Sequence, residues 1–193
     1  MRRMMNGKRK RSTRGMSLIE LMIALTVLTV GLAALLGLLT TAIAANTRNK
    51  LDTGGTLAAQ AIIETIAAQP GGGDVIMTDC AGNSFTVKTA SPAAGASPNN
   101  TGANLLNNSS IDFQNQAYSA VTTGYKVYYV GCGPAGRQVT YDVRWNVQTI
   151  SGNSRLITVG AEQLQGVRAL GTANQAKYFN PPVTLRTISA TGN

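Results

Sequence analysis

The longest apolar stretch of the chain begins shortly after residue 15 and predicts a helix that spans a membrane. From Leu21 to Ala45 the sequence has 25 uncharged residues, dominated by Leu, Ile, Ala, Val and Met. At about 1.5 Å of rise per residue this helix reaches about 37 Å, more than the roughly 30 Å of a hydrocarbon core. Because every face is apolar, we expect it to lie in lipid or inside a helix bundle.

Beyond residue 45 the pattern becomes mixed and predicts an amphipathic continuation of the same helix to residue 69. Gly54-Gly55 weakens this stretch and predicts a bend or local break. The Pro-Gly-rich sequence 69–73 predicts the end of the helix. An apolar stripe at helical spacing would face the rest of the protein, and it consists of Leu57, Ala58, Ala61, Ile62 and Ile66.

The sequence after residue 69 predicts antiparallel strands, so the fold class is α+β. Val139–Thr149 alternates strictly, which predicts one buried face and one wet face. The buried face would carry Val139, Tyr141, Val143, Trp145 and Val147, and the wet face Thr140, Asp142, Arg144, Asn146 and Gln148. Further strands are predicted at Ser84–Thr89, Tyr125–Val130, Arg155–Ala161 and, as an edge strand, Val183–Ile188.

Between the predicted strands, Ser91–Gln116 is rich in Ser, Asn, Ala, Gly and Pro. This composition offers little to bury and predicts a long surface excursion. A loop of this length is usually functional or disordered. The sequence leaves open whether it has a role or is a tolerated insertion.

The charge of the chain is concentrated at its start. Of the formal net charge of +9, residues 1–15 carry +7, so residues 16–193 carry only +2. The positive-inside bias places this basic segment in the cytoplasm and the rest outside the inner membrane. The nearly neutral remainder argues against a nucleic-acid partner, since such binding needs several phosphate contacts.

Glu20 is the only charged residue between Met16 and Ala45. One interpretation is an interfacial charge near the helix start, where the helix dipole favours an anion. The other requires a cut between Gly15 and Met16. The new amine would then lie four residues from Glu20, and in a stack of identical helices each carboxylate could neutralise a neighbour's amine.

The basic cluster, Gly15, the pentad Met16-Ser-Leu-Ile-Glu20 and the long apolar helix together resemble the type III signal of type IV prepilins and type II secretion pseudopilins. In that family a membrane-embedded aspartic peptidase cuts after the glycine and methylates the new amino terminus. The resemblance implies cleavage at Gly15–Met16, N-methylation of Met16 and a role of Glu20 in assembly. The family usually has Phe after the glycine, and Met is an accepted variant.

The resemblance also implies a pilin-like architecture. It consists of a cleaved leader at 1–15, a transmembrane and assembly half of the helix at 16–45, an amphipathic half at 46–69 and a periplasmic head at 70–193, with a variable loop at 91–116. The apolar half lacks the kinking proline of many major pilins. Together with the hairpin YDVRWNV…RLITV, this makes the chain most similar to PilV-type minor pilins.

Two simpler kinds of membrane signal fit the N-terminus less well. A secretory signal peptide would be cut near Ala42-Ile43-Ala44, but its apolar core normally runs about 7–15 residues, much shorter than here. A plain single-pass anchor accounts for the helix but not for the spacing of Gly15 and Glu20.

The chain has two cysteines, Cys80 and Cys132, and no histidine. In an oxidising periplasm a disulfide is favoured over two unrelated buried thiols. Closing a loop of about 50 residues is worth roughly 4 kcal/mol in the chain-entropy model. Without histidine, neither a Ser–His–Asp nor a Cys–His site can be built, and two cysteines alone do not supply a zinc site. We therefore expect no metal, no cofactor and no enzyme activity.

The sequence thus predicts a minor pilin of a type IV pilus, held in the bacterial inner membrane with its head in the periplasm before it enters the pilus. Its expected partners are the prepilin peptidase, other pilins or pseudopilins, the inner-membrane assembly platform and the membrane itself. The alternatives are a minor pseudopilin of a type II secretion system and an exported binding module that is only tethered by the helix.

Overall fold

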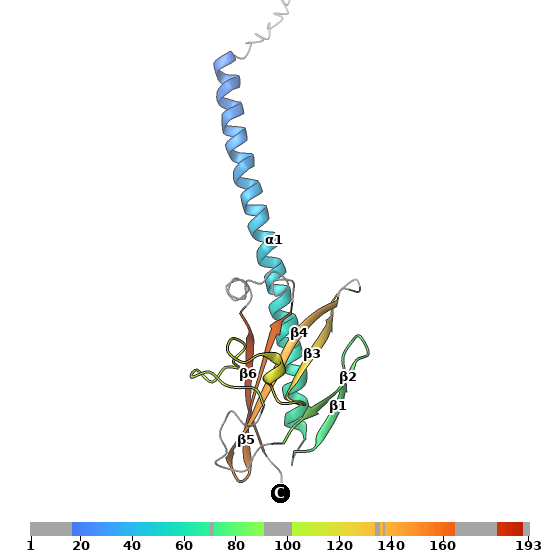
Figure 1. The fold of residues 1–193 in the computed structure, drawn as a ribbon. Helices are drawn as coiled ribbons and strands as arrows, with labels where there is room; N and C mark the ends of the chain where they lie inside the picture. Colours follow the sequence, from blue (N-terminus) through green and yellow to red (C-terminus); the bar gives the residue numbers. More distant parts are fainter. Residues whose placement is uncertain are drawn as a thin grey trace, which may run out of the picture. The chain divides into compact units, whose positions relative to one another are not determined.

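The computed structural model describes residues 17–69, 72–90, 102–133, 136, 138–164 and 181–190. Its one long helix, α1, runs from Leu18 to Ala68 (Figure 1). The chain divides into two units, one ending at Ala45 and the other beginning at Asn46. The helix ends where the Pro-Gly-rich sequence predicts, but it continues through Gly54-Gly55, so the expected break is wrong.

The strands form two antiparallel sheets. β1 (Asp74–Thr78) pairs with β2 (Ser84–Lys88) in a two-stranded sheet. A four-stranded sheet has the order β3-β4-β5-β6. Its strands are β3 (Lys126–Cys132), β4 (Gln138–Ser151), β5 (Ser154–Gln163) and β6 (Val183–Ala190). The α+β expectation is confirmed, although β1 was not predicted.

The main part of the core lies between the second half of α1 and one face of the larger sheet. Ile62 and Ile66 of the helix are fully buried, as are Val143, Trp145 and Val147 of β4. The predicted buried face of β4 is therefore confirmed for these residues. The buried stripe of the helix differs from the predicted one. Ala59 and Ile63 are buried although they were not predicted to be. Leu57 is 61% exposed, so its assignment to the stripe is wrong.

The glycine pair in α1 serves a close contact between helix and sheet. The hydroxyl of Tyr141 on β4 donates a hydrogen bond to the Leu51 carbonyl at 3.2 Å. A Cβ at Gly54 would overlap this hydroxyl, and one at Gly55 would lie 3.5 Å from the Tyr141 ring. Any larger residue at Gly54 would push β4 away. Close packing against β4 therefore explains why this helix contains glycine, which has a low helix propensity.

A buried arginine of β5 caps the end of α1. The Arg155 guanidinium donates to the carbonyls of Ile66 and Gln69 at the helix end, and to the Thr89 carbonyl at 2.7 Å. The Ile66 carbonyl also accepts the Gln69 backbone N–H at 3.3 Å. Carbonyls at the end of a helix carry the negative end of its dipole, so a cation here is favourable. Burial lowers the pKa of Arg155 from its usual value.

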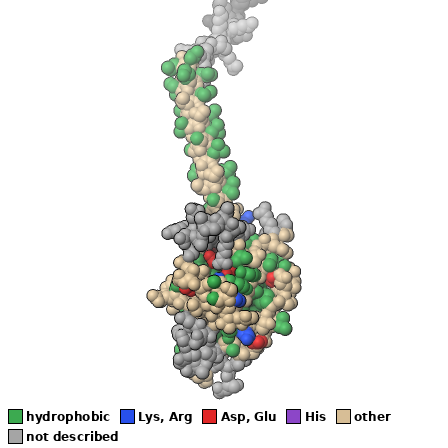
Figure 2. All heavy atoms as spheres, in the orientation of Figure 1, with side chains coloured by type: hydrophobic (Ala, Val, Ile, Leu, Met, Phe, Trp, Pro, Cys, Tyr) green, Lys and Arg blue, Asp and Glu red, His purple; other side chains and the backbone are tan. Residues whose placement is uncertain are grey.

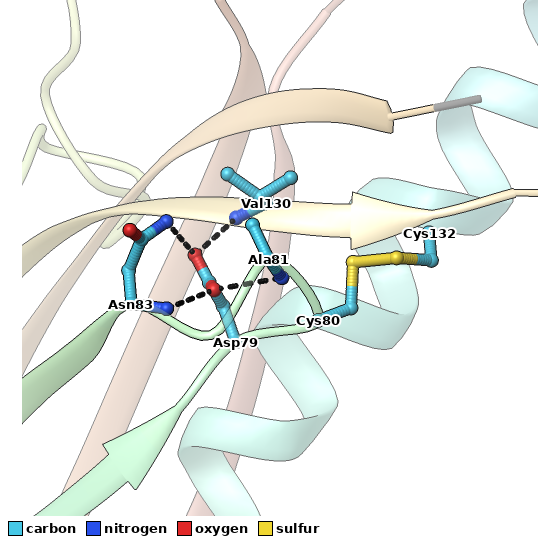
Figure 3. The surroundings of a disulfide bond; sticks show 6 residues. All are labelled: Asp79, Cys80, Ala81, Asn83, Val130 and Cys132. Atoms are coloured by element: carbon cyan, nitrogen blue, oxygen red, sulfur yellow. Dashed lines mark hydrogen bonds between the residues drawn. A yellow bond between two sulfur atoms is a disulfide. The ribbon is translucent and has the colours of Figure 1, made fainter. Parts of the chain in front are cut away.

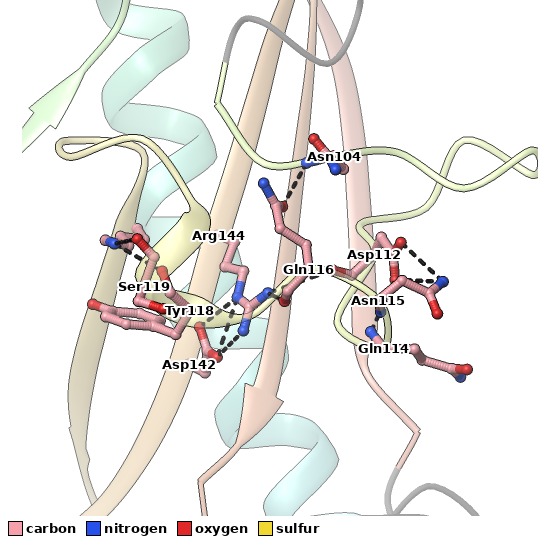
Figure 4. Close-up of polar contacts among 10 residues, drawn as sticks. Asn104, Asp112, Gln114, Asn115, Gln116, Tyr118, Ser119, Asp142 and Arg144 are labelled. Carbon is pink, nitrogen blue, oxygen red and sulfur yellow. Dashed lines mark hydrogen bonds and ion pairs between the residues drawn. The ribbon is translucent and has the colours of Figure 1, made fainter.

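The polar face of β4 is also buried, which corrects the prediction of a wet face. Asp142, Arg144 and Asn146 are at most 1% exposed. They lie beneath residues 102–120, which we call the strap (Figure 4). The alternating sequence shows which residues share a face but not that another segment covers the polar one.

The strap itself corrects the expected surface excursion. Ala103, Ile111 and Phe113 are buried and belong to the hydrophobic core. The strap ends in a short 3-10 helix, η2 (Tyr118–Ala120). Residues 91–101, the first part of the expected loop, lie outside the described residues. The apolar side chains of the strap are scattered among Ser, Asn and Gln without a strand or helix period, and this pattern concealed their burial.

The strap packs closely against Gly160 of β5, and replacing this glycine tests that packing. A Cβ at Gly160 would lie 2.8 Å from the Phe113 ring and 2.9 Å from Ile111. We expect Gly160→Ala to lower the free energy of unfolding by about 1–3 kcal/mol, because the strap must shift. Gly152→Ala is the control, since a Cβ there meets nothing within 4 Å. Denaturant unfolding in detergent measures both, and equal stability of the two variants would contradict the packing.

Candidate functional site

The first half of α1 presents its apolar side chains outward on all sides. Every residue from Leu18 to Ala45 is exposed, and Figure 2 shows hydrophobic side chains along the helix. By length and composition, α1 is the one helix among the described residues that could cross a membrane. In water such a surface is unfavourable, so this half requires lipid or other apolar helices around it.

Polar groups within this apolar half are satisfied by the helix itself. Thr26, Thr29, Thr40 and Thr41 each donate their hydroxyl to the backbone carbonyl three residues earlier, at 2.8–2.9 Å. Such internal hydrogen bonds remove the cost of placing a hydroxyl in hydrocarbon. These threonines are therefore compatible with a membrane span.

Glu20 lies in the first turn of α1 and accepts a hydrogen bond from the Ser17 backbone N–H at 3.0 Å. This is one half of a capping box, in which an acid three residues after the helix cap satisfies a free amide. The Ser17-x-x-Glu20 pattern could have predicted it from the sequence. The contact agrees with the interfacial interpretation of Glu20.

The predicted cleavage residues, Gly15 and Met16, lie outside the described residues. The pairing of Glu20 with an amine on Met16 is therefore an expectation that these contacts do not test. The Ser17 amide donates to Oε2 of this carboxylate, and among the described residues no hydrogen bond to Oε1 is formed, so Oε1 can accept a second donor.

Cys80 and Cys132 are joined by a disulfide, with a Cα–Cα distance of 5.8 Å (Figure 3). The bond connects the turn that follows β1 to the last residue of β3. The Cys80 backbone N–H also donates to the Val130 carbonyl at 3.4 Å. The smaller sheet is thus attached to the larger one by a covalent bond beside a backbone contact.

The carboxylate of Asp79 organises this junction. It accepts the backbone N–H groups of Ala81 and Asn83 at 3.0 and 2.8 Å, the Asn83 side chain at 2.9 Å and the Val130 N–H at 3.3 Å. Desolvation by burial would raise the pKa of Asp79, but these hydrogen bonds outweigh it and hold the pKa below its usual 3.8. The site is a structural brace, with all its acceptors facing protein donors.

Among the described residues no group of three or more His, Cys, Asp or Glu side chains could hold a metal ion.

Comparison with family models identifies the N-terminal region. Residues 10–36 match the prokaryotic N-terminal methylation motif. This motif is the type IV pilin-like prepilin signal, and it supports a type IV pilin or pseudopilin, a structural subunit rather than an enzyme. It implies processing by prepilin peptidase and assembly with other pilins, and with the apolar helix it fits membrane anchoring. No curated protein and no solved structure matches the chain.

The Asp79 brace predicts an acid-sensitive junction. A carboxylate whose pKa is lowered on folding stabilises the folded chain above its unfolded pKa of about 3.9, and this stability is lost as pH falls through the lower folded value. We expect Asp79→Asn to cost about 1–3 kcal/mol at pH 7 and less at pH 3. Asp74→Asn, at an exposed position of β1, is the control. Unfolding at both pH values measures the difference, and a cost independent of pH would contradict the charged brace.

Proposed function

We propose that the protein is a minor pilin of a type IV pilus, of the PilV type. One observation carries this proposal: a methylation motif at residues 10–36 overlaps a continuous helix whose apolar side chains are exposed from Leu18 to Ala45. A secretory signal would be discarded with its apolar segment, whereas here that segment continues without interruption into the buried half of α1.

The mechanism has three steps. The helix first holds the subunit in the inner membrane, with residues 1–15 in the cytoplasm and the head in the periplasm. The peptidase then cuts after Gly15 and methylates the amine of Met16. The assembly machinery finally moves residues 16–45 from lipid into a bundle of like helices. This transfer exchanges one apolar contact for another, so it costs little hydrophobic free energy.

The division of the chain follows from these steps. Residues 1–15 form the leader, 16–45 the membrane and assembly half, 46–69 the amphipathic half, and 70–193 the head. The Cys80–Cys132 disulfide supports a periplasmic head, because such bonds persist in oxidising compartments.

A minor pseudopilin of a type II secretion system carries the same signal and fits the same helix. A strain that lacks the gene separates the two assignments: loss or shortening of pili supports the pilus, and loss of secretion supports the secretion machine. Normal pili and normal secretion would favour an exported binding module that uses the helix only as a tether.

We expect Glu20→Ala to be processed and retained in the membrane but to enter filaments on the order of tenfold less, or not at all. The carboxylate is needed to neutralise a buried amine, and an unpaired charge in a helix bundle costs several kcal/mol. Sheared filaments and membranes are compared by immunoblotting with the native machinery present.

One further variant separates the charge of Glu20 from its capping contact, and another serves as its control. Glu20→Gln keeps an acceptor for the Ser17 amide but removes the charge, so it should fail as Glu20→Ala does. Glu64→Gln, at an exposed acid in the second half of α1, should assemble normally. If Glu20→Gln enters filaments at the native level, the carboxylate acts only as a helix cap and the assembly role is lost.

We expect Gly15→Val to block removal of the leader, because the peptidase requires the smallest side chain before the scissile bond. The protein should then keep its full N-terminus and remain in the membrane. Intact mass and N-terminal sequencing of the purified protein give the answer directly. A Met16 start in this variant would refute the cleavage assignment.

A further inference from the structure

Two cations follow directly after the uncharged part of α1. Arg48 and Lys50 are both exposed, and neither forms an ion pair within the described residues. In an α-helix, side chains two residues apart point about 200° from one another. The two cations therefore lie on opposite sides of the helix, and a single neighbouring acidic side chain could not satisfy both.

The length of the uncharged stretch places these cations at a particular depth in a bilayer. From Leu21 to Thr47 the chain has no charged residue, which corresponds to about 40 Å of helix. A hydrocarbon core is about 30 Å thick and the whole bilayer about 40–45 Å. With Glu20 at one interface, Arg48 and Lys50 fall within the opposite headgroup layer, where their aliphatic stems can lie along the apolar boundary.

We propose that Arg48 and Lys50 bind the phosphate groups of anionic phospholipids in the outer leaflet of the inner membrane. This proposal rests on the membrane-anchored state of the proposed function. The Arg48 guanidinium suits two parallel hydrogen bonds to one phosphate, whereas the Lys50 ammonium acts as a point charge. Because the cations face opposite sides, they contact different lipids and together fix the depth of the helix.

These contacts define a resting position for the subunit before assembly. The leader carries seven cations, whereas only Arg48 and Lys50 directly follow the apolar segment. The positive-inside bias therefore still places the leader in the cytoplasm. Sliding the helix toward the cytoplasm would draw Arg48 and Lys50 into hydrocarbon, which is strongly unfavourable for each charge. Sliding it outward separates each cation from its phosphate, so extraction into a filament must break these ion pairs.

The experiment uses the full chain reconstituted in phosphatidylcholine vesicles with and without phosphatidylglycerol. Electron spin resonance with spin-labelled lipids measures the preference of the protein's surrounding lipids for phosphatidylglycerol over phosphatidylcholine. We expect Arg48→Gln/Lys50→Gln to lower this preference on the order of twofold to fivefold. The difference should shrink in high salt, because the contacts are solvent-accessible ion pairs. Arg186→Gln removes one exposed cation of β6 and should retain the native preference; it is compared with each of the single variants Arg48→Gln and Lys50→Gln.

Three results would overturn the proposal. An unchanged preference in the double variant would show that these cations do not select the lipid. An equal loss in Arg186→Gln would assign the effect to net charge rather than to position. Release of the native chain from the vesicles by alkaline extraction would refute the membrane anchor itself, and with it the proposed function. The first two results leave that function intact.

Discussion

The head depends on a buried ion pair that lies between the sheet and the strap. Arg144 and Asp142, both on β4, are joined at 2.7 Å with both side chains at most 1% exposed. The guanidinium also donates to the Gln116 carbonyl at 2.6 Å and stacks over the Phe113 ring at 4.8 Å. A buried charge is tolerated only when its remaining donors are satisfied, so the strap must stay in place for Arg144 to be buried. The same contact that orders the strap therefore makes β4 a strand covered on both faces.

Other polar contacts support this arrangement around the ion pair. The Asn146 side chain donates to the Ala103 carbonyl at 2.8 Å, and the Asn104 amide donates to the Gln116 side chain at 2.7 Å. At the end of the strap, Tyr118 stacks on Tyr128 of β3. Burial, followed by the nearby Asp142 charge, raises the pKa of Tyr118 to about 12, so its hydroxyl stays protonated. The strap is thus held mainly by side chains of the sheet rather than by strand pairing.

This distinction explains which parts of the protein the sequence could predict. The N-terminal signal, the helix and the apolar face of β4 were predictable because each is encoded by neighbouring residues with a fixed period. The covered polar face was not, because its partners lie far along the chain, as Arg144 and Gln116 do. The helix cap by Arg155 is still more remote, since its acceptor Ile66 is 89 residues away. At the candidate site, the capping contact of Glu20 was visible in the local Ser17-x-x-Glu20 spacing.

The disulfide closes a loop that encloses the strap. Cys80 and Cys132 are separated by 52 residues, and the closed loop contains β2, the whole strap and nearly all of β3. In the chain-entropy model this closure stabilises the folded state by about 4 kcal/mol. A segment with little secondary structure forms few backbone contacts of its own, so it gains most when the unfolded chain is restricted. The disulfide and the Arg144–Asp142 pair therefore act on the same segment, one by limiting the unfolded states and the other by fixing the folded one. In an oxidising compartment the disulfide thus stabilises the strap, the segment whose composition predicted the least order.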